Sequence, residues 1–416
     1  MVKVAALSGG ALAALLLTTA AAWAVPTPQG TPFRVTSCDK CRQDAPVVAG
    51  STTGAFLAVW EGSNATEPRS VDGRFFNTTG APQANDFAIV QSGVPDKYDA
   101  AVTRDTKGNF IVVWSSVAND NSDVMAQKFQ VNGNPLGAPF KVNVDDPAAP
   151  TIPMDFNPAV ARTSDGGFIV AWIDVLPVGD NFPGTQPQVM ARRFTAAATP
   201  AGPQIKVSTG LVNGDRPEVC VDTAGRPVIV WTTVNNFRPF EANLKGIAMR
   251  RLSAKGVPLG GETPVVAPAA TTLKTAVSCG NGSTFVVVWQ SDAAPATDLA
   301  DVLGQRFNNQ GRPAGAKFVV NSTPTGEQRN PAISHDSTGA FVVVWQALQG
   351  GRQGIYGRRF TVKGAPTGPD FEVASDTPTI LAPINPDVAH TSAKGNFVVV
   401  WQKGSPGAIF GLRFTP

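Results

Sequence analysis

The sequence predicts an all-β protein, a seven-bladed β-propeller of four-stranded antiparallel blades. Two observations support this prediction: an apolar phrase ending in tryptophan recurs along the 416 residues, and the last copy lacks one strand. The tryptophans are separated by 54, 58, 59, 58, 56 and 56 residues, and they are Trp60, Trp114, Trp172, Trp231, Trp289, Trp345 and Trp401. A nearly constant period of this length indicates a repeat architecture.

Each repeat contains four short runs rich in β-branched and aromatic residues, as expected of strands. The first is a Pro-x-Val run, as in residues 157–161, and the second ends in the tryptophan, as in residues 397–401. The third ends in a basic-aromatic pair, as in residues 304–307, and the fourth is Phe-x-Val, as in residues 371–373. Four such strands in each period describe one propeller blade.

Turn chemistry joins these runs. Asp105-Thr106-Lys107-Gly108 links a first run to a second, and residues 363–368, with two glycines and a proline, link a third to a fourth. Glycine supplies a positive φ and aspartate bonds its own backbone, so we expect tight hairpins and antiparallel pairing. The second run is apolar almost throughout, which predicts a strand buried on both faces.

A basic residue stands next to last in the third run in six of the seven repeats. A residue type that recurs in almost every blade is interpreted as structural. The basic residues are Lys128, Arg193, Arg251, Arg306, Arg359 and Arg413, with Phe75 in the remaining repeat.

The two ends of the chain favour a closed ring over an open solenoid. The seventh repeat stops after its third run, residues 408–414, and an unassigned fourth-type strand, Phe33–Thr36, precedes the first repeat. We expect this N-terminal strand to complete the last blade, which pairs both free edges. An open solenoid would need capping repeats, and none is visible in the sequence.

The N-terminus reads as a secretory signal. Residues 1–24 combine Lys3 with a long apolar stretch and end in Ala22-Trp23-Ala24, which predicts a mature domain of residues 25–416. An uncleaved anchor is the alternative. We expect a secreted or periplasmic monomer without a further membrane span. The formal net charge of +3 is too small to indicate a nucleic-acid partner.

The four cysteines form two candidate pairs. Cys38 and Cys41 predict a local disulfide in an oxidising compartment, with half of a zinc site as the alternative. Cys220 and Cys279 fall on the first strands of adjacent blades, where a disulfide between the blades is possible, although the two differ by one position in the repeat.

Two candidate metal sites follow from the sequence. Cys279, His335 and His390 occupy one repeat position in three successive blades, and they are suitable ligands for zinc or copper. The alternative is that this position simply tolerates varied residues. Residues 119–123 form an acidic, oxygen-rich segment that could bind calcium, although the glycine and glutamate of the usual calcium loop are absent. No other cofactor is expected.

The long links between second and third strands, and between fourth and first, are expected on one face of the ring. Variable loops on a rigid scaffold often carry function, so polar and aromatic residues there are candidate ligand contacts. The alternative is solvated loop residues that pack on each other. The candidates are Asp174, Asp180, Phe182, Asn235, Phe237, Arg238 and Glu241.

The repeat phrase resembles repeats found in large bacterial secreted and surface proteins. Residues 285–290, 304–307 and 318–321 carry the resemblance most clearly, and it extends over nearly all of residues 31–416. The resemblance implies a propeller and an extracellular setting. It brings no catalytic residues with it.

The sequence contains no recognisable catalytic motif, such as His-Glu-x-x-His or Gly-x-Ser-x-Gly. It therefore favours a secreted, non-catalytic binding module that recognises a glycan or a protein through the long-loop face. One alternative is an extracellular polysaccharide-acting hydrolase or lyase, which would need converging carboxylates or a metal at the channel mouth. Another alternative is a structural component of the cell surface.

Overall fold

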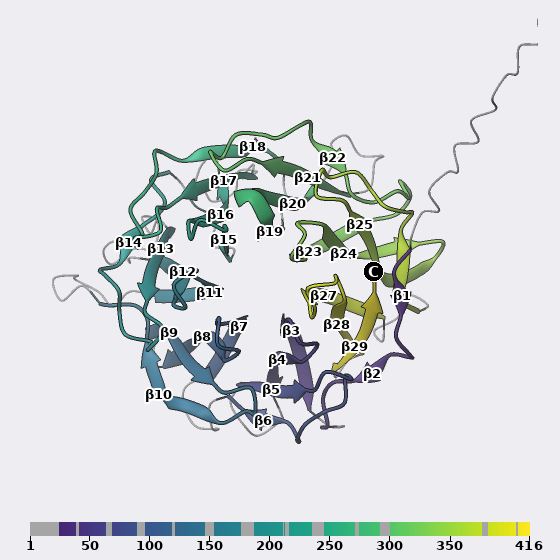
Figure 1. Ribbon diagram of the computed structural model, residues 1–416, viewed down its shortest axis with the longest axis horizontal. Helices are drawn as coiled ribbons and strands as arrows, with labels where there is room; N and C mark the ends of the chain where they lie inside the picture. The colour runs from purple at the N-terminus through teal and green to yellow at the C-terminus, as the bar shows by residue number, and fades with distance from the viewer. Residues whose placement is uncertain are drawn as a thin grey trace, which may run out of the picture.

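The strands form a ring of radial blades around a central channel (Figure 1). The computed structural model describes residues 25–38, 41–63, 69–89, 96–118, 121–145, 154–175, 187–210, 212, 216–234, 245–270, 274–291, 300–376, 382–404 and 407–416. The fold class predicted from the sequence is confirmed: in this described part, the chain is built of four-stranded antiparallel units. The predicted signal peptide, residues 1–24, lies outside the described residues.

Seven strands line the channel, and the other strands of each blade follow outwards. The innermost strands are β3 (Arg42–Gly50), β7 (Asp96–Arg104), β11 (Met154–Arg162), β15 (Glu218–Val221), β19 (Thr275–Cys279), β23 (Gln328–His335) and β27 (Pro383–His390). The second strands are β4 (Phe56–Ser63), β8 (Phe110–Ala118), β12 (Phe168–Val175), β16 (Pro227–Val234), β20 (Phe285–Ser291), β24 (Phe341–Gln349) and β28 (Phe397–Lys403). The third strands are β5 (Ser70–Phe76), β9 (Asn121–Phe129), β13 (Pro187–Phe194), β17 (Lys245–Arg251), β21 (Asp301–Phe307), β25 (Arg352–Phe360) and β29 (Ala408–Thr415).

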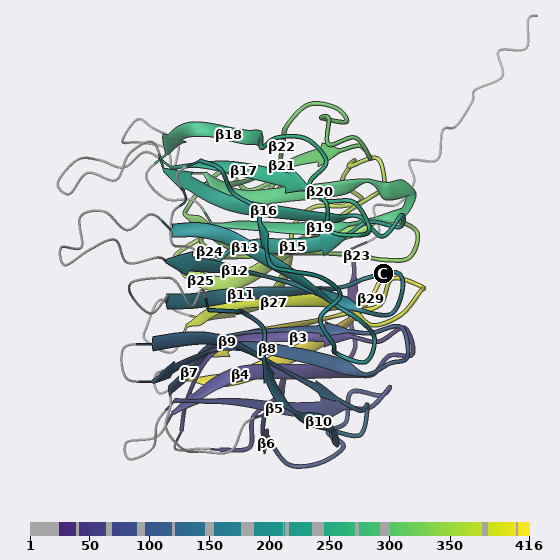
Figure 2. The same ribbon diagram turned by 90° about the vertical axis from the view of Figure 1, so that its left-hand side faces the viewer.

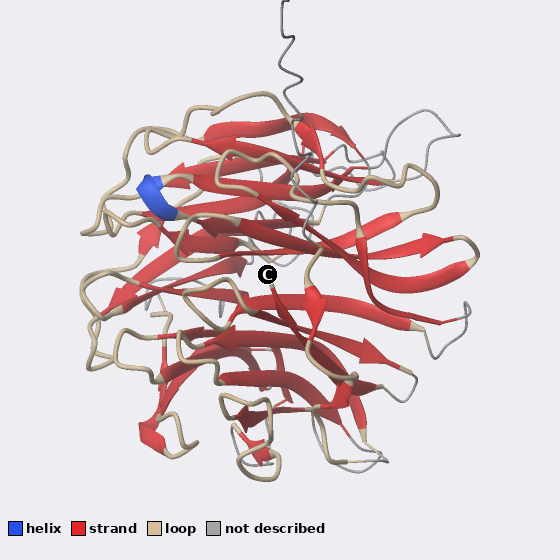
Figure 3. Cartoon of the chain, turned by 45° about the vertical axis from the view of Figure 1, so that its right-hand side comes forward, coloured by secondary structure: helices blue, strands red, loops and turns tan. Residues whose placement is uncertain are grey.

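The outermost strands are short or irregular. They are β6 (Phe87–Ala88), β10 (Pro135–Lys141), β14 (Ile205–Lys206), β18 (Thr263–Ala270), β22 (Phe318–Val319) and β26 (Phe371–Asp376), with β1 (Thr27–Pro28) and β2 (Phe33–Arg34) in the last blade. Blades two and three share one eight-stranded sheet because a parallel bridge joins Met154 to Ser122. Among the described residues, the only helix is the 3-10 turn η2 (Asn281–Ser283), and none is long and apolar enough to cross a membrane (Figure 3).

Side chains packed between neighbouring blades form the core. The seven repeated tryptophans are at most 1% exposed, and the second strands are buried on both faces as predicted. Each inter-blade cluster combines residues of two adjacent blades, for example Trp172 with Ile111 and Val113. The apolar second strand is therefore explained by its position between two neighbours.

The N-terminal segment completes the last blade, as predicted from the ends of the chain. Phe33 pairs with Gly411, and the N–H of Val35 donates to the carbonyl of Ile409 at 2.8 Å. The pairing extends further than expected, because Thr27 also pairs with Thr415 at the edge of β29. The segments 388 positions apart in sequence are thus joined by backbone hydrogen bonds.

Three of the repeated basic residues link their blade to the next one, in agreement with their structural interpretation. The Arg306 guanidinium donates to the carbonyl of Lys363 at 2.7 Å, and the Lys128 ammonium donates to that of Ala196 at 2.7 Å. At the closure of the ring, Arg413 donates to Thr78 at 2.9 Å.

The residue immediately before this basic position adds a second inter-blade link, which sequence reasoning missed. In four blades it is an arginine whose guanidinium donates to a valine carbonyl of the preceding blade, at 2.8–3.1 Å. The pairs are Arg74 with Val35, Arg192 with Val142, Arg250 with Val207, and Arg358 with Val320.

Tight turns gather along one edge of the ring, as the side view shows (Figure 2). The carboxylate of Asp105 accepts hydrogen bonds from the backbone N–H groups of Lys107 and Asn109, at 2.9 and 2.8 Å. Gly108 has a φ of 95°, which a residue with a Cβ rarely adopts. The Asp-x-x-Gly phrase therefore forms the predicted hairpin.

Candidate functional site

Two carboxylates interrupt the repeat where the inner strands face the channel. Each inner strand carries a valine or isoleucine at one repeat position. The residue before it is small and apolar in five blades: Val47, Ala101, Ala159, Ala276 and Ala332. Blades four and seven carry Glu218 and Asp387 there instead, on β15 and β27. Three blades separate the two strands in one direction around the ring, so β15 and β27 border the channel on different sides (Figure 1).

Glu218 is half-buried, and its pKa is raised. Loss of hydration raises its pKa to about 7, and the negative charge of Asp387 contributes to the increase. The positive charges of Arg216 and Lys274 oppose it. A carboxyl group with this pKa is protonated in a large fraction of molecules at neutral pH.

Asp387 is also half-buried, and its carboxylate accepts hydrogen bonds from two backbone N–H groups. Burial raises its pKa to about 6, while hydrogen bonds from two backbone N–H groups and the charge of Arg216 lower it. The donors are Val48 of the neighbouring blade and Val388, each at 2.8 Å. Asp387 therefore also helps to hold blade one against blade seven.

Glu61, at the end of the second strand of blade one, is a third carboxylate near Arg216. It accepts a hydrogen bond from the backbone N–H of Asp99 at 2.8 Å, and burial raises its pKa. Arg216 acts electrostatically on Glu61, Glu218 and Asp387, which lie in blades one, four and seven. The positive charge of a single guanidinium thus acts on carboxylates of three different blades.

Side-chain amides continue the polar rim beside these acids. Asn330 donates to Gln346 at 3.1 Å and to Asn385 at 3.3 Å, and Asn385 donates to Gln402 at 3.3 Å. Gln402 then donates to Asp44 of blade one at 2.7 Å. This arc of donors and acceptors crosses three blades and is suited to a ligand rich in hydroxyl groups.

The arrangement has the properties that acid–base chemistry requires. Two carboxylates stand on inner strands of the ring, burial raises both of their pKa values, and the charge of Asp387 acts on Glu218. Titratable groups whose environments separate their pKa values are the usual mark of an acid and base pair.

Most of the ligand contacts predicted from the loops fall outside the described residues: Asp180, Phe182, Asn235, Phe237, Arg238 and Glu241. Asp174 is described, and it does not lie in a loop. It belongs to β12, opposite Gln188, whose amide donates to its carboxylate at 2.8 Å, and it is 9% exposed. Because β12 continues to Val175, Asp174 lies inside the strand, and its burial against β13 argues against a direct ligand contact.

The proposed Cys279–His335–His390 metal site needs correction at its cysteine. Cys279 forms a disulfide with Cys220, and the two Cα atoms are 5.5 Å apart, so no thiolate is available for a metal. Cys38 and Cys41 form the second disulfide. His335 and His390 line the channel and are not brought together with a third ligand among the described residues.

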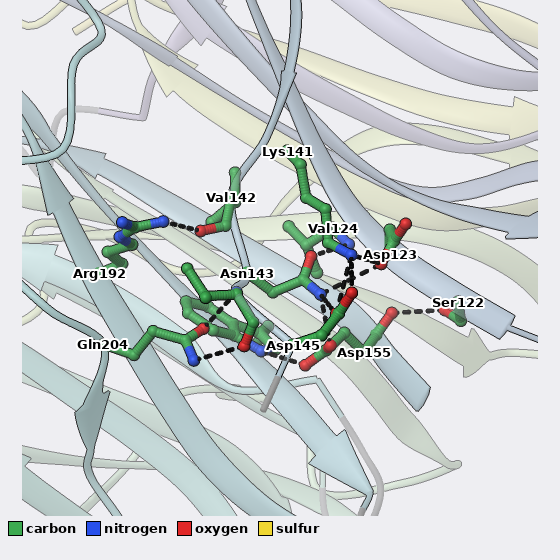
Figure 4. Close-up of polar contacts among 12 residues, drawn as sticks. Ser122, Asp123, Val124, Lys141, Val142, Asn143, Asp145, Asp155, Arg192 and Gln204 are labelled. Atoms are coloured by element: carbon green, nitrogen blue, oxygen red, sulfur yellow. Dashed lines mark hydrogen bonds and ion pairs between the residues drawn. The ribbon is translucent and has the colours of Figure 1, made fainter. Parts of the chain in front are cut away.

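The acidic segment predicted for calcium also differs from expectation. Residues 121–123 belong to strand β9 and not to a loop, while residues 119 and 120 are outside the described part. Asp123 lies within 4.8 Å of Asp145 and Asp155 (Figure 4). Calcium remains a prediction at this cluster.

An ammonium group already occupies a central position in this acidic cluster. Lys141 contacts Asp123 at 2.6 Å and Asp145 at 2.7 Å, and Asn143 donates to Asp155 at 2.6 Å (Figure 4). Burial and the charge of Asp174 raise the pKa of Asp155 to about 8. We interpret the cluster as a structural link between blades two and three.

Sequence reasoning missed Glu218, Asp387 and the adjacent Arg216 because it treated the Pro-x-Val run as scaffold, and it missed Glu61 because it treated the second strand in the same way. The signal was present in the repeats: where other blades place alanine or valine, Pro217-Glu218-Val219 and Pro386-Asp387-Val388 place an acid. A charged residue at a small apolar position of a buried strand is costly unless it has a partner or a function.

No known family model and no curated protein sequence matches the chain. Solved structures resemble it in fold. A protein of unknown function from Dyadobacter fermentans is 13% identical, with a TM-score of 0.52, and the match covers 92% of this chain and 98% of that one. An α-L-arabinanase from Penicillium chrysogenum, complexed with arabinobiose, is 11% identical with a TM-score of 0.50, covering 94% and 99%.

A puromycin hydrolase is also similar, at 12% identity and a TM-score of 0.54. The match covers 87% of this chain but only half of the hydrolase chain. At these identities, the likeness shows the shared propeller fold.

The prediction of a non-catalytic binding module is wrong. Its alternative, a polysaccharide-acting hydrolase, needed converging carboxylates or a metal at the channel mouth. Glu218 and Asp387 are two half-buried acids on inner strands, and the charge of Asp387 acts on Glu218. The propellers that resemble this one include an arabinan-acting enzyme. The absence of a short catalytic motif was a poor guide because the two acids are 169 residues apart in the sequence.

Proposed function

We propose that this protein is an extracellular glycoside hydrolase that acts on a polysaccharide. The observation that carries the proposal is the pair of half-buried carboxylates, Glu218 and Asp387, at equivalent positions of two inner strands, with the charge of Arg216 acting on both. The arabinanase among the similar folds suggests arabinan as the first substrate to test.

In the proposed reaction, Glu218 is the general acid and Asp387 the base. Glu218 donates its proton to the glycosidic oxygen as the bond to the anomeric carbon breaks. Asp387 takes a proton from the water that forms the new bond to this carbon, so both protons are accounted for. Arg216 keeps Asp387 anionic, and the amide arc from Asn330 to Asp44 binds sugar hydroxyls.

An extracellular setting agrees with this activity. Two disulfides are typical of proteins that fold in an oxidising compartment, and residues 1–24 are expected to act as an export signal. The resemblance to bacterial secreted and surface repeats supports the same location, where a glycan would be the partner.

The test is the release of reducing ends from arabinan, xylan and galactan by residues 25–416. The Glu218→Gln variant is expected to lose at least about 100-fold in kcat, because a general acid contributes about 10²–10⁴-fold. Glu372→Gln, which changes a carboxylate on the outermost strand β26, is the matched control and should keep full activity.

The pH profile separates a catalytic role from a structural one. Activity of the wild type should fall above about pH 7, as Glu218 loses its proton, and below about pH 6, as Asp387 gains one. A wild-type protein that releases no reducing ends from any of the three glycans, or a Glu218→Gln variant with full activity, would refute the proposal.

A further inference from the structure

We propose that the opposite end of the channel holds a second binding site, for a small molecule that carries a carboxylate or phosphate group. The site is a cavity of about 720 Å³, formed by the C-terminal ends of the seven inner strands and the tight turns that follow them. Its lining starts at Val219 and Val388, one residue beyond Glu218 and Asp387, and contains neither acid. The inference is independent of the hydrolase proposal.

The size of the cavity is that of a small-molecule site, since such pockets measure about 300–1,000 Å³. A ring of β-branched residues, one from each inner strand, lines the cavity where it approaches the two acids: Val48, Val102, Val160, Val219, Val277, Ile333 and Val388. The polar groups lie beyond this ring, in the turns. A ligand could therefore place an apolar body against the ring and a polar head at the turns.

The carboxylates of the cavity wall are neutralised by basic side chains that do not themselves line the cavity. Asp105 is paired with Lys128 at 2.9 Å, and its side chain is 2% exposed. Two further aspartates at the same repeat position are paired in the same way, Asp222 with Arg226 at 2.8 Å and Asp336 with Arg359 at 3.3 Å. These three ion pairs contribute no net charge to the cavity.

Two arginines remain as the charge of the lining. Arg104 and Arg162 occupy one repeat position on adjacent strands, β7 and β11, and neither forms an ion pair with a described carboxylate. Burial lowers the pKa of Arg104, the negative charge of Asp105 opposes this, and the positive charge of Arg162 adds to the lowering. Like charges held together in a concave site favour an anion between them.

Arg104 is also held in position. Its guanidinium lies over the ring of Phe110, 6.0 Å from the centroid, and its Nε donates to the carbonyl of Gly108 at 3.2 Å. Arg162, by contrast, is exposed to solvent. A guanidinium fixed in this way is suited to bind carboxylate or phosphate oxygens in a defined geometry.

The histidines on the opposite wall add polar contacts without charge. His335 and His390 occupy the repeat position of Arg104 in blades six and seven, and each packs on the first phenylalanine of its second strand. Burial lowers their pKa values to about 3 and about 4, so both are neutral at physiological pH. Ser334 contacts Nδ1 of His390 at 2.9 Å. The positive charge is therefore confined to the arginine side of the cavity.

The experiment is isothermal titration calorimetry of residues 25–416 with inorganic phosphate, sodium D-galacturonate and neutral D-galactose. We expect binding of at least one of the two anions, weakening in high salt, and little binding of galactose. Arg162→Gln should weaken it by about 10-fold or more, because hydrogen bonds to charged groups contribute about 1.5–3 kcal/mol. Arg104→Met, which keeps the packing on Phe110, should act in the same direction.

Arg329→Gln is the matched control, since this arginine pairs with Glu327 at 2.7 Å on another part of the ring and lines no part of the cavity. A preference for phosphate or for galacturonate would identify the source of the oxyanion. The proposal is overturned if neither anion binds at millimolar concentration, if galactose binds as well as galacturonate, or if both arginine variants bind like the wild type.

Discussion

The disulfide between Cys220 and Cys279 is expected to be a large contributor to stability. It joins the inner strands of blades four and five and closes a loop with a sequence separation of 59. The chain-entropy relation gives a loss of about 14 cal/mol/K for a loop of this length, which corresponds to about 4 kcal/mol at 25 °C. The Cys220→Ala/Cys279→Ala variant should lose about this much free energy of unfolding.

The second disulfide provides an internal control. Cys38 and Cys41 are separated by three positions, for which the same relation gives only about 1.5 kcal/mol. Both double-alanine variants would be unfolded in guanidinium chloride and followed by tryptophan fluorescence, since the repeated tryptophans are buried. The reasoning would be refuted if the two variants lost equal stability, or if the Cys220 pair contributed less than the Cys38 pair.

Two further predictions concern the joints of the ring. Removing residues 25–37 should abolish cooperative unfolding or solubility, because β1 and β2 pair with β29, and unchanged thermal melting of the truncated protein would contradict this. Asp155→Asn should flatten the dependence of stability on pH, measured by urea unfolding between pH 5 and 8. The pKa of Asp155 is raised to about 8, so its contribution is complete below about pH 4 and is lost as pH rises through 8, by up to about 1.4 kcal/mol per pH unit. A wild type and variant with parallel profiles would exclude this role.

The scaffold could be predicted from the sequence because the same strand and turn patterns recur in every repeat. The tryptophan phrase and the Asp-x-x-Gly turns recur along the chain, and their local chemistry predicts strands and hairpins. The strand at Phe33 was predicted because the seventh repeat lacks its fourth strand. The partners of the repeated basic residues could not be predicted, because Arg413 and Thr78 are 335 positions apart and meet only when the ring closes.

The candidate site was harder to predict for the same reason. Glu218 and Asp387 belong to separate copies of one strand, and only the ring brings their charges within reach of Arg216. The search for short motifs instead favoured the histidines and Cys279, which share a repeat position but face different neighbours. His335 packs against Gly280, and His390 contacts Ser334.

The closure of the ring has a consequence for how the protein is made. Thr27 is synthesised early, but its partner Thr415 in β29 is synthesised near the end of the chain, so the last blade can be completed only then. Contacts this distant in sequence form slowly, since the loop between them must be closed first. During synthesis and export, the edges of the growing blades are therefore exposed to other chains, and a chaperone that shields unpaired strands would be needed until the last residues emerge.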